Sequence, residues 1–385
     1  MEKITSLILL VFIYTGYLSL YFFAPPLWNN ALYVGIILMV ISILSLILST
    51  VIPKNWVKHI IYSSFILQLS LLGLKGVHND VFRFMWDGWL LYNNISPFNH
   101  TPDIINKLYP HLASVWYWDL LDFKHLNTIY PATTQYMFWI AAIIKQNSII
   151  VLQYIQIILL IGIFKLCNAL LTKDNTTHKL LTFFFLSPIV IFDGVLGVHT
   201  EILITFFLLL TILLYKKNKS ILLGISYALL VLTKFYPILF APFILKIKKS
   251  YKTILSALAT ACIVSIPILK NTENILIQIK SLKRFGQEWI ASPGIFSLLY
   301  KFYNIIGIEN YMAYASITSF IAVVISIILV YYKRAPIIDA LMFILGIYLF
   351  TSPVVFSWYL IPLFALSILA KSKFKWAFLT TITVF

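Results

Sequence analysis

The chain has 385 residues, of which 61% are hydrophobic and only 11% are charged, and its mean hydropathy is +0.92. An average soluble domain is about half apolar and about a quarter charged, so this composition excludes a water-soluble enzyme, a disordered chain and a coiled coil. The net charge of +16 comes from short lysine clusters between apolar runs. This is the pattern of cytoplasmic loops in membrane proteins, and it indicates membrane lipids rather than nucleic acid as the partner of these charges.

Apolar runs of about 20 residues can cross the 30 Å of hydrocarbon in a bilayer as helices. The first such run lacks a small-residue cleavage site, so we predict a retained helix rather than a signal peptide. Counting long and short runs together, we predict an all-α polytopic membrane protein with about 12–13 transmembrane helices. The long runs lie at 5–24, 31–52, 57–76, 148–171, 179–197, 251–269, 311–332 and 354–370. The shorter runs lie at 131–144, 200–215, 219–233, 236–247, 294–306, 336–350 and 375–385.

The lysine clusters decide which of the short runs cross the membrane. With the N-terminus inside, they place segment 77–130 outside the cytoplasmic membrane. A run as short as 131–144 is about 21 Å long as a helix, so we predict that it and 294–306 dip into the membrane without crossing. Between Lys219 and Lys246 we predict two short helices that meet at a break over 234–237. The two cysteines, Cys167 and Cys262, lie in separate apolar runs and are predicted to be small core residues.

Segment 77–130 differs from the rest of the chain. It holds five acidic and three basic residues, a local charge of −2, and four of the ten tryptophans. A loop of about 50 residues is usually either functional or disordered, and this one is too aromatic to be disordered. We therefore predict a folded, functional loop that faces outward.

At the start of this loop, Asp80, Arg83 and Asp87 have the spacing of one helix face. Two interpretations remain open at this point. A carboxylate just above the membrane, flanked by an arginine and tryptophans, can act as a general base on a hydroxyl group. An ion pair on an amphipathic helix explains the same spacing without any chemistry.

Five short segments follow one another in a fixed order along the chain. They are DVFRFMWDG with SPF at 80–98, TIYPA at 128–132, SP and VHTE at 187–201, LTKFYP at 232–237, and SP and WY at 352–359. In this order they are similar to motifs of the GT-C superfamily of integral-membrane glycosyltransferases. The branch that they resemble most consists of the mannosyltransferase-like enzymes that use polyprenyl-phosphate-linked sugars.

The resemblance implies a fold and a domain organisation. It implies a GT-C-like bundle in which residues 1–385 form a single integral-membrane unit. The first outer loop, 77–130, would carry the catalytic acid, a second outer loop would span 270–306, and C-terminal helices would occupy 311–385. The protein would be a multi-pass protein of the cell membrane, with its active site facing the outside or the periplasm.

The resemblance also implies a reaction. A hexose, mannose by family analogy, would move with inversion from a polyprenyl phosphate to a glycan or lipid acceptor, with Asp80 as the general base. The leaving group is then a lipid phosphate, which needs cationic contacts as the bond breaks. Arg83, Lys234 and Arg284 are the predicted contacts, because arginine in particular binds phosphate with a planar fork. A buried ion pair for Lys234 and an interfacial anchor for Arg284 are the alternatives.

Further residues are assigned by their place in the same motifs. Asp87, His199 and Glu201 are predicted as a second acid or as contacts to the acceptor or the sugar. Trp86 and Trp89 are predicted to stack on sugar rings, although an interfacial aromatic belt also explains tryptophans at this position. A histidine such as His199 at an interface is also often structural.

No cofactor is expected, because a lipid-phosphate donor requires neither a nucleotide nor a glycine-rich phosphate loop. A divalent metal bound by His78, Asp80 and Asp87 is a less favoured alternative. Two other functions remain open: a flippase or transporter of lipid-linked saccharides, and a polysaccharide polymerase or ligase that uses lipid-diphosphate donors. Few ionisable residues fall inside the apolar runs, which argues against the polar pathway of a transporter.

Overall fold

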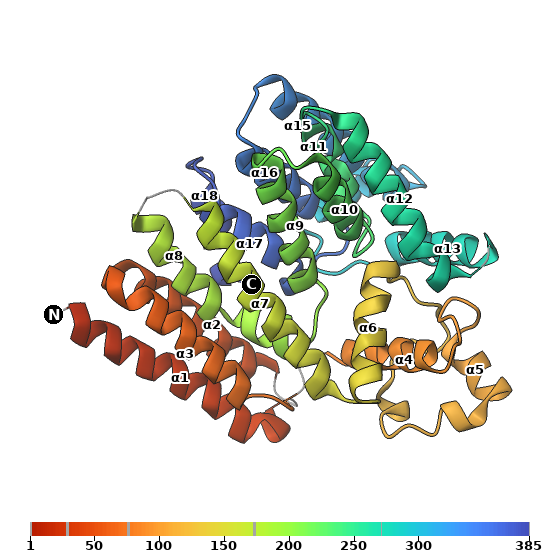
Figure 1. Cartoon of the computed structure of the whole chain (residues 1–385), viewed down its shortest axis with the longest axis horizontal. Helices are drawn as coiled ribbons and strands as arrows, with labels where there is room; N and C mark the ends of the chain where they lie inside the picture. The colour runs from red at the N-terminus through yellow and green to blue at the C-terminus, as the bar shows by residue number, and fades with distance from the viewer. Residues whose placement is uncertain (1, 28–30, 75–77, 172–174, 271, 385) are drawn as a thin grey trace. The chain divides into compact units, whose positions relative to one another are not determined.

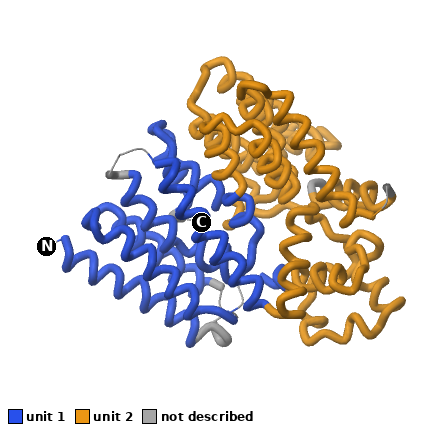
Figure 2. Tube along the Cα trace, viewed as in Figure 1, with its two compact units in different colours: residues 1–81, 149–206, 360–385 blue, residues 82–148, 207–359 orange. Residues whose placement is uncertain are grey.

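In the computed structural model, all regular elements of the described residues are helices (Figure 1). One isolated bridge joins Ala291 and Val354. Helices satisfy their backbone hydrogen bonds internally, as a chain this apolar requires in lipid. The chain divides into two compact units, each assembled from separate stretches of sequence (Figure 2). The structure describes residues 2–27, 31–74, 78–171, 175–270 and 272–384.

Unit 1 comprises residues 1–81, 149–206 and 360–385. Helix α8 is its centre, because α2, α3 and α17 all contact it. Phe183 and Phe184 of α8 pack against Phe364 of α17, with ring centroids 4.7 and 5.1 Å apart. The helices of unit 1 are α1 (Glu2–Leu27), α2 (Ala31–Val51), α3 (Val57–Ser70), α7 (Ile149–Leu170), α8 (Asn175–Leu186), the π-helical η4 (Ile189–Leu196), α17 (Leu360–Leu369) and α18 (Lys375–Val384).

Unit 2 comprises residues 82–148 and 207–359. Helices α10 and α12 pack so closely that a side chain at Gly224 would collide with Ser256 and with the backbone of Thr253. Its helices are α4 (Asp80–Tyr92, beginning in unit 1), α5 (Pro102–Leu108), α6 (Ala132–Ile144), α9 (Glu201–Lys216, beginning in unit 1), α10 (Ser220–Val231), η5 (Tyr236–Phe240), α11 (Ala241–Ile244), α12 (Ser250–Leu269), α13 (Thr272–Glu288), α14 (Gly294–Ile305), α15 (Tyr311–Tyr332), α16 (Ile337–Phe350) and η6 (Ser357–Tyr359).

Five helices of the described residues are long and apolar enough to cross a membrane: α1, α2, α7, α12 and α15. They become six if α8 and η4, which meet at a bend of 49°, form one broken span. The prediction of a helical membrane protein is confirmed at this level. The number is lower than the predicted twelve or thirteen, because several apolar runs form helices of only 10–17 residues, such as α6, α10 and α16.

The chain breaks between two helices close to the place that the sequence predicts. Helix α10 ends at Val231 and η5 begins at Tyr236, so the break lies at 232–235, two residues before the predicted 234–237. Proline at 237 favours such a break, since it cannot donate the backbone hydrogen bond of a continuing helix.

Cys167 is buried as predicted, whereas Cys262 is exposed on α12 and its prediction as a core residue is wrong.

Residues 78–130 form a folded segment with a dense aromatic interior. Phe82 stacks on Tyr117 with centroids 5.9 Å apart, and Trp86 packs against Trp118 at 5.3 Å. After α5, Pro110–Leu112 and Trp118–Leu120 form single 3-10 turns. The prediction that this segment is folded is therefore confirmed for the described residues.

Candidate functional site

Arg83 and Asp87 form an ion pair one turn apart on α4. The Nε of Arg83 donates to Oδ1 of Asp87 over 3.0 Å, and the Asp87 side chain is fully buried. The Nη1 of Arg83 also donates to the backbone carbonyl of Leu126 at 3.0 Å. The ion pair that the spacing left open is thus formed, and it lies inside the protein rather than on its surface.

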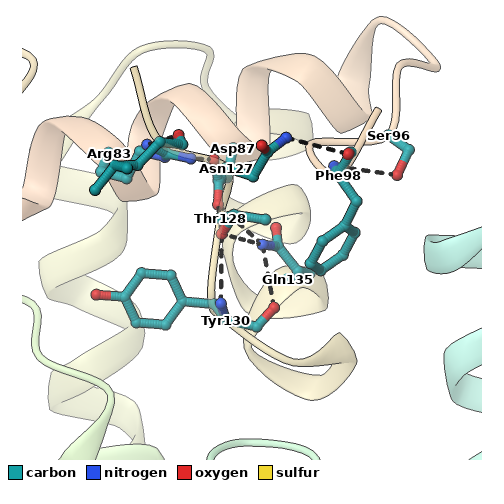
Figure 3. A network of polar contacts seen from close by, with 9 residues as sticks. Arg83, Asp87, Ser96, Phe98, Asn127, Thr128, Tyr130 and Gln135 are labelled. Atoms are coloured by element: carbon teal, nitrogen blue, oxygen red, sulfur yellow. Dashed lines mark hydrogen bonds and ion pairs between the residues drawn. The ribbon is translucent and has the colours of Figure 1, made fainter. Parts of the chain in front are cut away.

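The second carboxylate oxygen of Asp87 accepts two more hydrogen bonds (Figure 3). The Oγ1 of Thr128 donates to Oδ2 over 2.5 Å, and Nε2 of Gln135 donates to the same oxygen over 2.9 Å. Both oxygens of this buried carboxylate are therefore bound by protein donors, as a buried charge requires. Asp87 connects α4 to the chain that leads into α6, and its contacts give it a structural role in this segment.

Gly88, which follows Asp87, allows α4 and α6 to approach each other. A Cβ at this position would collide with the backbone carbonyl of Phe138 on α6. In the same contact, Phe84 stacks on Phe138 with centroids 4.8 Å apart. The aspartate and the glycine of the first motif thus both serve the packing of unit 2.

The two tryptophans of α4 are held by protein contacts. Trp86 is fully buried, so the prediction that its ring stacks on a sugar is not supported by its position: neither indole face is accessible. Trp89 is half-buried, and its Nε1 donates to the carbonyl of Leu112 over 3.1 Å while its ring stacks on Tyr92 at 5.8 Å. Of the two, only Trp89 retains an accessible surface.

Unit 2 contains a cavity of about 450 Å³. Three of the five motif segments meet in its wall, although more than 200 residues separate the first from the last: Tyr130 and Pro131, Lys234 to Tyr236, and Ser352 to Tyr359. Most of the remaining wall is apolar and comes from α13, α14, α15 and α16. The lining residues are Ile129, Tyr130, Pro131, Lys234, Phe235, Tyr236, Leu239, Leu282, Phe285, Phe296, Ser316, Ser319, Phe320, Val323, Tyr348, Thr351, Ser352, Pro353, Val354 and Tyr359.

Hydrogen bonds to backbone carbonyls hold these segments against one another. At the start of α6, the amide of Thr133 donates to the carbonyl of Leu232 over 3.0 Å, and Oγ1 of Thr134 donates to the carbonyl of Thr233 over 2.9 Å. The turn that carries Lys234 is thereby fixed to the segment that carries Tyr130 and Pro131. The segment that carries Pro353 pairs with Ala291. The amide of Ala291 donates to the carbonyl of Pro353 over 3.1 Å, and the amide of Val355 donates to the carbonyl of Ala291 over 2.8 Å.

Lys234 is the one charged residue among the lining residues that the structure describes. Its Nζ lies 3.8 Å from the centroid of the Tyr359 ring, within the range of a cation–π interaction. Next to it, Tyr236 stacks on Tyr348 with centroids 5.3 Å apart. The cavity therefore presents one half-buried ammonium group, surrounded by aromatic rings, to an otherwise mainly apolar space. Such a site can bind an anionic head group that is joined to an apolar chain.

The other predicted acid and histidine positions fall in unit 1. Asp80 is the first residue of α4 and is half-buried. His199 and Glu201 are 3% and 1% exposed, and Glu201 begins α9. The ring of His199 lies 6.5 Å from that of His78. Near-complete burial means that His199 and Glu201 are held by the protein in this structure.

Two buried glutamines of α7 fix the segment before His199. The Nε2 of Gln153 donates to the carbonyls of Leu74 and Leu196, and Nε2 of Gln156 donates to the carbonyl of Val198 over 3.3 Å. Val198 has a φ of 59°, which is costly for a β-branched side chain and persists only where the surroundings enforce it. Sequence reasoning missed these glutamines and Gln135. Their signal was an amide side chain inside an apolar run, which tends to be functional or structural in membrane helices.

Arg284 lies on the exposed side of α13, whereas Leu282 and Phe285 of the same helix line the cavity. The described residues contain no group of three or more His, Cys, Asp or Glu side chains that could hold a metal ion. His78, Asp80 and Asp87 do not form such a group.

No family model, no curated protein and no solved structure matches this chain.

Proposed function

We propose that the chain is an integral-membrane glycosyltransferase of the GT-C type. It would transfer a hexose, mannose by family analogy, from a polyprenyl phosphate to a glycan or lipid acceptor on the outer side of the cell membrane. The observation that carries the proposal is the convergence of three motif segments on one cavity. The segments resemble the GT-C motifs independently of one another, and packing brings them together around one cation.

The composition of the cavity suits a lipid-phosphate donor. An apolar wall can bind isoprene units through burial of their surface, which is worth about 25 cal/mol per Å². The ammonium group of Lys234 would neutralise the phosphate, which gains charge as the bond to the sugar breaks. Lys234 is the phosphate contact that the cavity provides, because Arg83 is committed to Asp87 and Leu126 and Arg284, predicted as a further contact, does not line the cavity.

The transfer step would use Asp80 as the general base. The acceptor hydroxyl oxygen forms a bond to the anomeric carbon, the bond from that carbon to the phosphate oxygen breaks, and the hydroxyl proton passes to the Asp80 carboxylate. Polyprenyl phosphate leaves, and the configuration at the anomeric carbon inverts. His199 and Glu201 remain candidates for orienting the sugar or the acceptor.

The test is sugar transfer from a short-chain polyprenyl phosphate mannose by protein purified in detergent. Asp80→Asn should abolish transfer and leave donor binding nearly unchanged, because the amide keeps the shape and loses the base. The matched control is Asp122→Asn, which changes an exposed acid of the same segment and should transfer normally. Full activity of Asp80→Asn would remove the assignment of the base.

A carrier or flippase of lipid-linked saccharides is the second candidate. The observation in its favour is that the cavity wall has a cation and no carboxylate among its described residues. Saturable donor binding without any transfer or donor hydrolysis, in the wild type and in Asp80→Asn alike, would favour it. A flipping assay in liposomes would then decide.

A further inference from the structure

Helix α13 turns two amide side chains inward and leaves an apolar stripe exposed. Two amide side chains face the protein: Asn274 donates to Oδ1 of Asn99 over 2.8 Å, and Gln278 donates to the carbonyl of Tyr130 over 3.4 Å. Both are more than nine-tenths buried. On a soluble protein the face turned inward is the apolar one.

The outward surface of α13 is apolar along one flank. Ile275, Leu276 and Ile279 are 41%, 58% and 56% exposed. At 3.6 residues per turn these three side chains form one continuous stripe. Exposing such a stripe to water is unfavourable, so an apolar medium or partner is required to cover it.

The neighbouring flank of the same helix is cationic. Lys280 and Arg284 lie beside the apolar stripe, and Lys283 continues the line of the stripe one turn beyond Ile279; all three are exposed. An apolar stripe bordered by lysine and arginine is the pattern of helices that lie in a membrane surface. The apolar side chains reach the acyl region, and the cations meet the phosphates of anionic lipids.

The position of α13 in the chain supports the same occupant. It follows α12, which is among the helices long and apolar enough to cross a membrane, and the two helices contact each other. Helix α12 is itself exposed along its length at Leu258, Ile263 and Ile266, each 60% or more. A helix that begins where a membrane-spanning helix ends is close to the lipid head groups.

We propose that α13 lies in the bilayer surface and binds anionic lipids. Ile275, Leu276 and Ile279 enter the acyl region, and the three cations pair with lipid phosphates. Leu282 and Phe285 of the same helix line the cavity, so this lipid surface adjoins it. The proposal concerns the membrane contact alone and stands whether or not the protein transfers sugars.

The first test measures the depth of single bimane labels on the full chain in nanodiscs, in a Cys167→Ala/Cys262→Ala background. A label at Leu276→Cys or Ile279→Cys should be quenched by lipids with brominated acyl chains and protected from aqueous iodide. A label at Glu273→Cys, exposed on the polar flank, should show the reverse. All three positions are exposed, so the substitutions leave the fold unchanged. If the Leu276 label is quenched by iodide as strongly as the Glu273 label and not by lipid, the proposal is wrong.

The second test measures lipid preference at the Leu276 label with brominated phosphatidylglycerol and brominated phosphatidylcholine. The wild type should favour the anionic lipid. The variant Lys280→Gln/Lys283→Gln/Arg284→Gln should lose that preference by about fivefold or more, because a single basic residue near an anionic surface already contributes about that factor. The control Lys246→Gln/Lys248→Gln/Lys249→Gln removes three exposed lysines elsewhere and should leave the preference intact. An unchanged preference in the α13 variant would overturn the role of its cations.

Discussion

Two regions of unit 2 each enclose a charged side chain, and they differ in what surrounds it. Around Asp87, protein donors occupy both carboxylate oxygens and the charge is neutralised by Arg83. Around Lys234, aromatic rings border the ammonium group, and a cavity of about 450 Å³ lies next to it. Both charged side chains have contacts within the protein, but of the two only Lys234 also borders a cavity, where a ligand can reach it.

The largest expected effect comes from breaking the Asp87 network. Asp87→Ala leaves the Arg83 guanidinium without its counter-charge, and removing one partner of a buried pair costs about 3–5 kcal/mol. The double variant Arg83→Leu/Asp87→Leu should recover part of that loss, because no isolated charge is left inside. The stability of the single and the double variant is measured by thermal unfolding in detergent, monitored through the loss of the monodisperse peak.

Asp122→Ala is the control for this comparison, since it removes an exposed acid of the same segment. Its thermal unfolding should occur at the same temperature as that of the wild type. Equal stability of Asp87→Ala and Asp122→Ala would contradict a structural role for Asp87.

Lys234 is expected to show the opposite behaviour. Lys234→Gln should weaken binding of a polyprenyl phosphate about 10- to 100-fold, the range of a hydrogen bond to a charged group, while unfolding stays close to the wild type. The matched control is Lys246→Gln, because Lys246 Nζ lies 3.7 Å from the centroid of Tyr331 in the same kind of cation–π contact and does not line the cavity. Binding titrations with a short-chain polyprenyl phosphate should separate the two variants. A similar loss of affinity in both would show that the cavity is not the binding site.

The smallest expected effect appears at alkaline pH. Burial raises the pKa of the Tyr117 phenol well above its usual range, and the nearby Asp87 carboxylate raises it further. The folded protein therefore keeps this proton to higher pH than the unfolded chain, whose phenol has a pKa of about 10. The resulting stability is fully present below pH 10 and is lost as the pH rises above that value.

Tyr117→Phe should remove this loss, at the expense of the 2.9 Å hydrogen bond from the phenol to Oδ1 of Asn147. The stability of the wild type should fall more steeply than that of Tyr117→Phe between pH 9 and pH 11. Parallel curves for the two proteins would mean that the phenol does not take part.

Much of the local structure was predictable from the sequence, because local structure follows from neighbours along the chain. The spacing of residues 80, 83 and 87 predicted one helix face, and α4 with its Arg83–Asp87 pair bears that out. The break near Pro237 was predicted from the short distance between the lysine clusters on either side of it, and the chemistry of proline favours it. The number of helices able to cross a membrane was not, since hydropathy shows an apolar run but not where its helix ends.

The sequence by itself determined that this chain is helical, apolar and suited to a membrane, because its composition and the length of its apolar runs are enough for that. Only the tertiary structure decided what the charged residues face. Thr128 and Gln135 reach Asp87 from 41 and 48 residues away, and three separate motif segments form one cavity wall. The amphipathicity of α13 can be read from its residues, but only the structure shows that Asn274 and Gln278 turn inward, toward hydrogen-bond acceptors of Asn99 and Tyr130. Contacts between residues this far apart depend on packing, which no local pattern encodes.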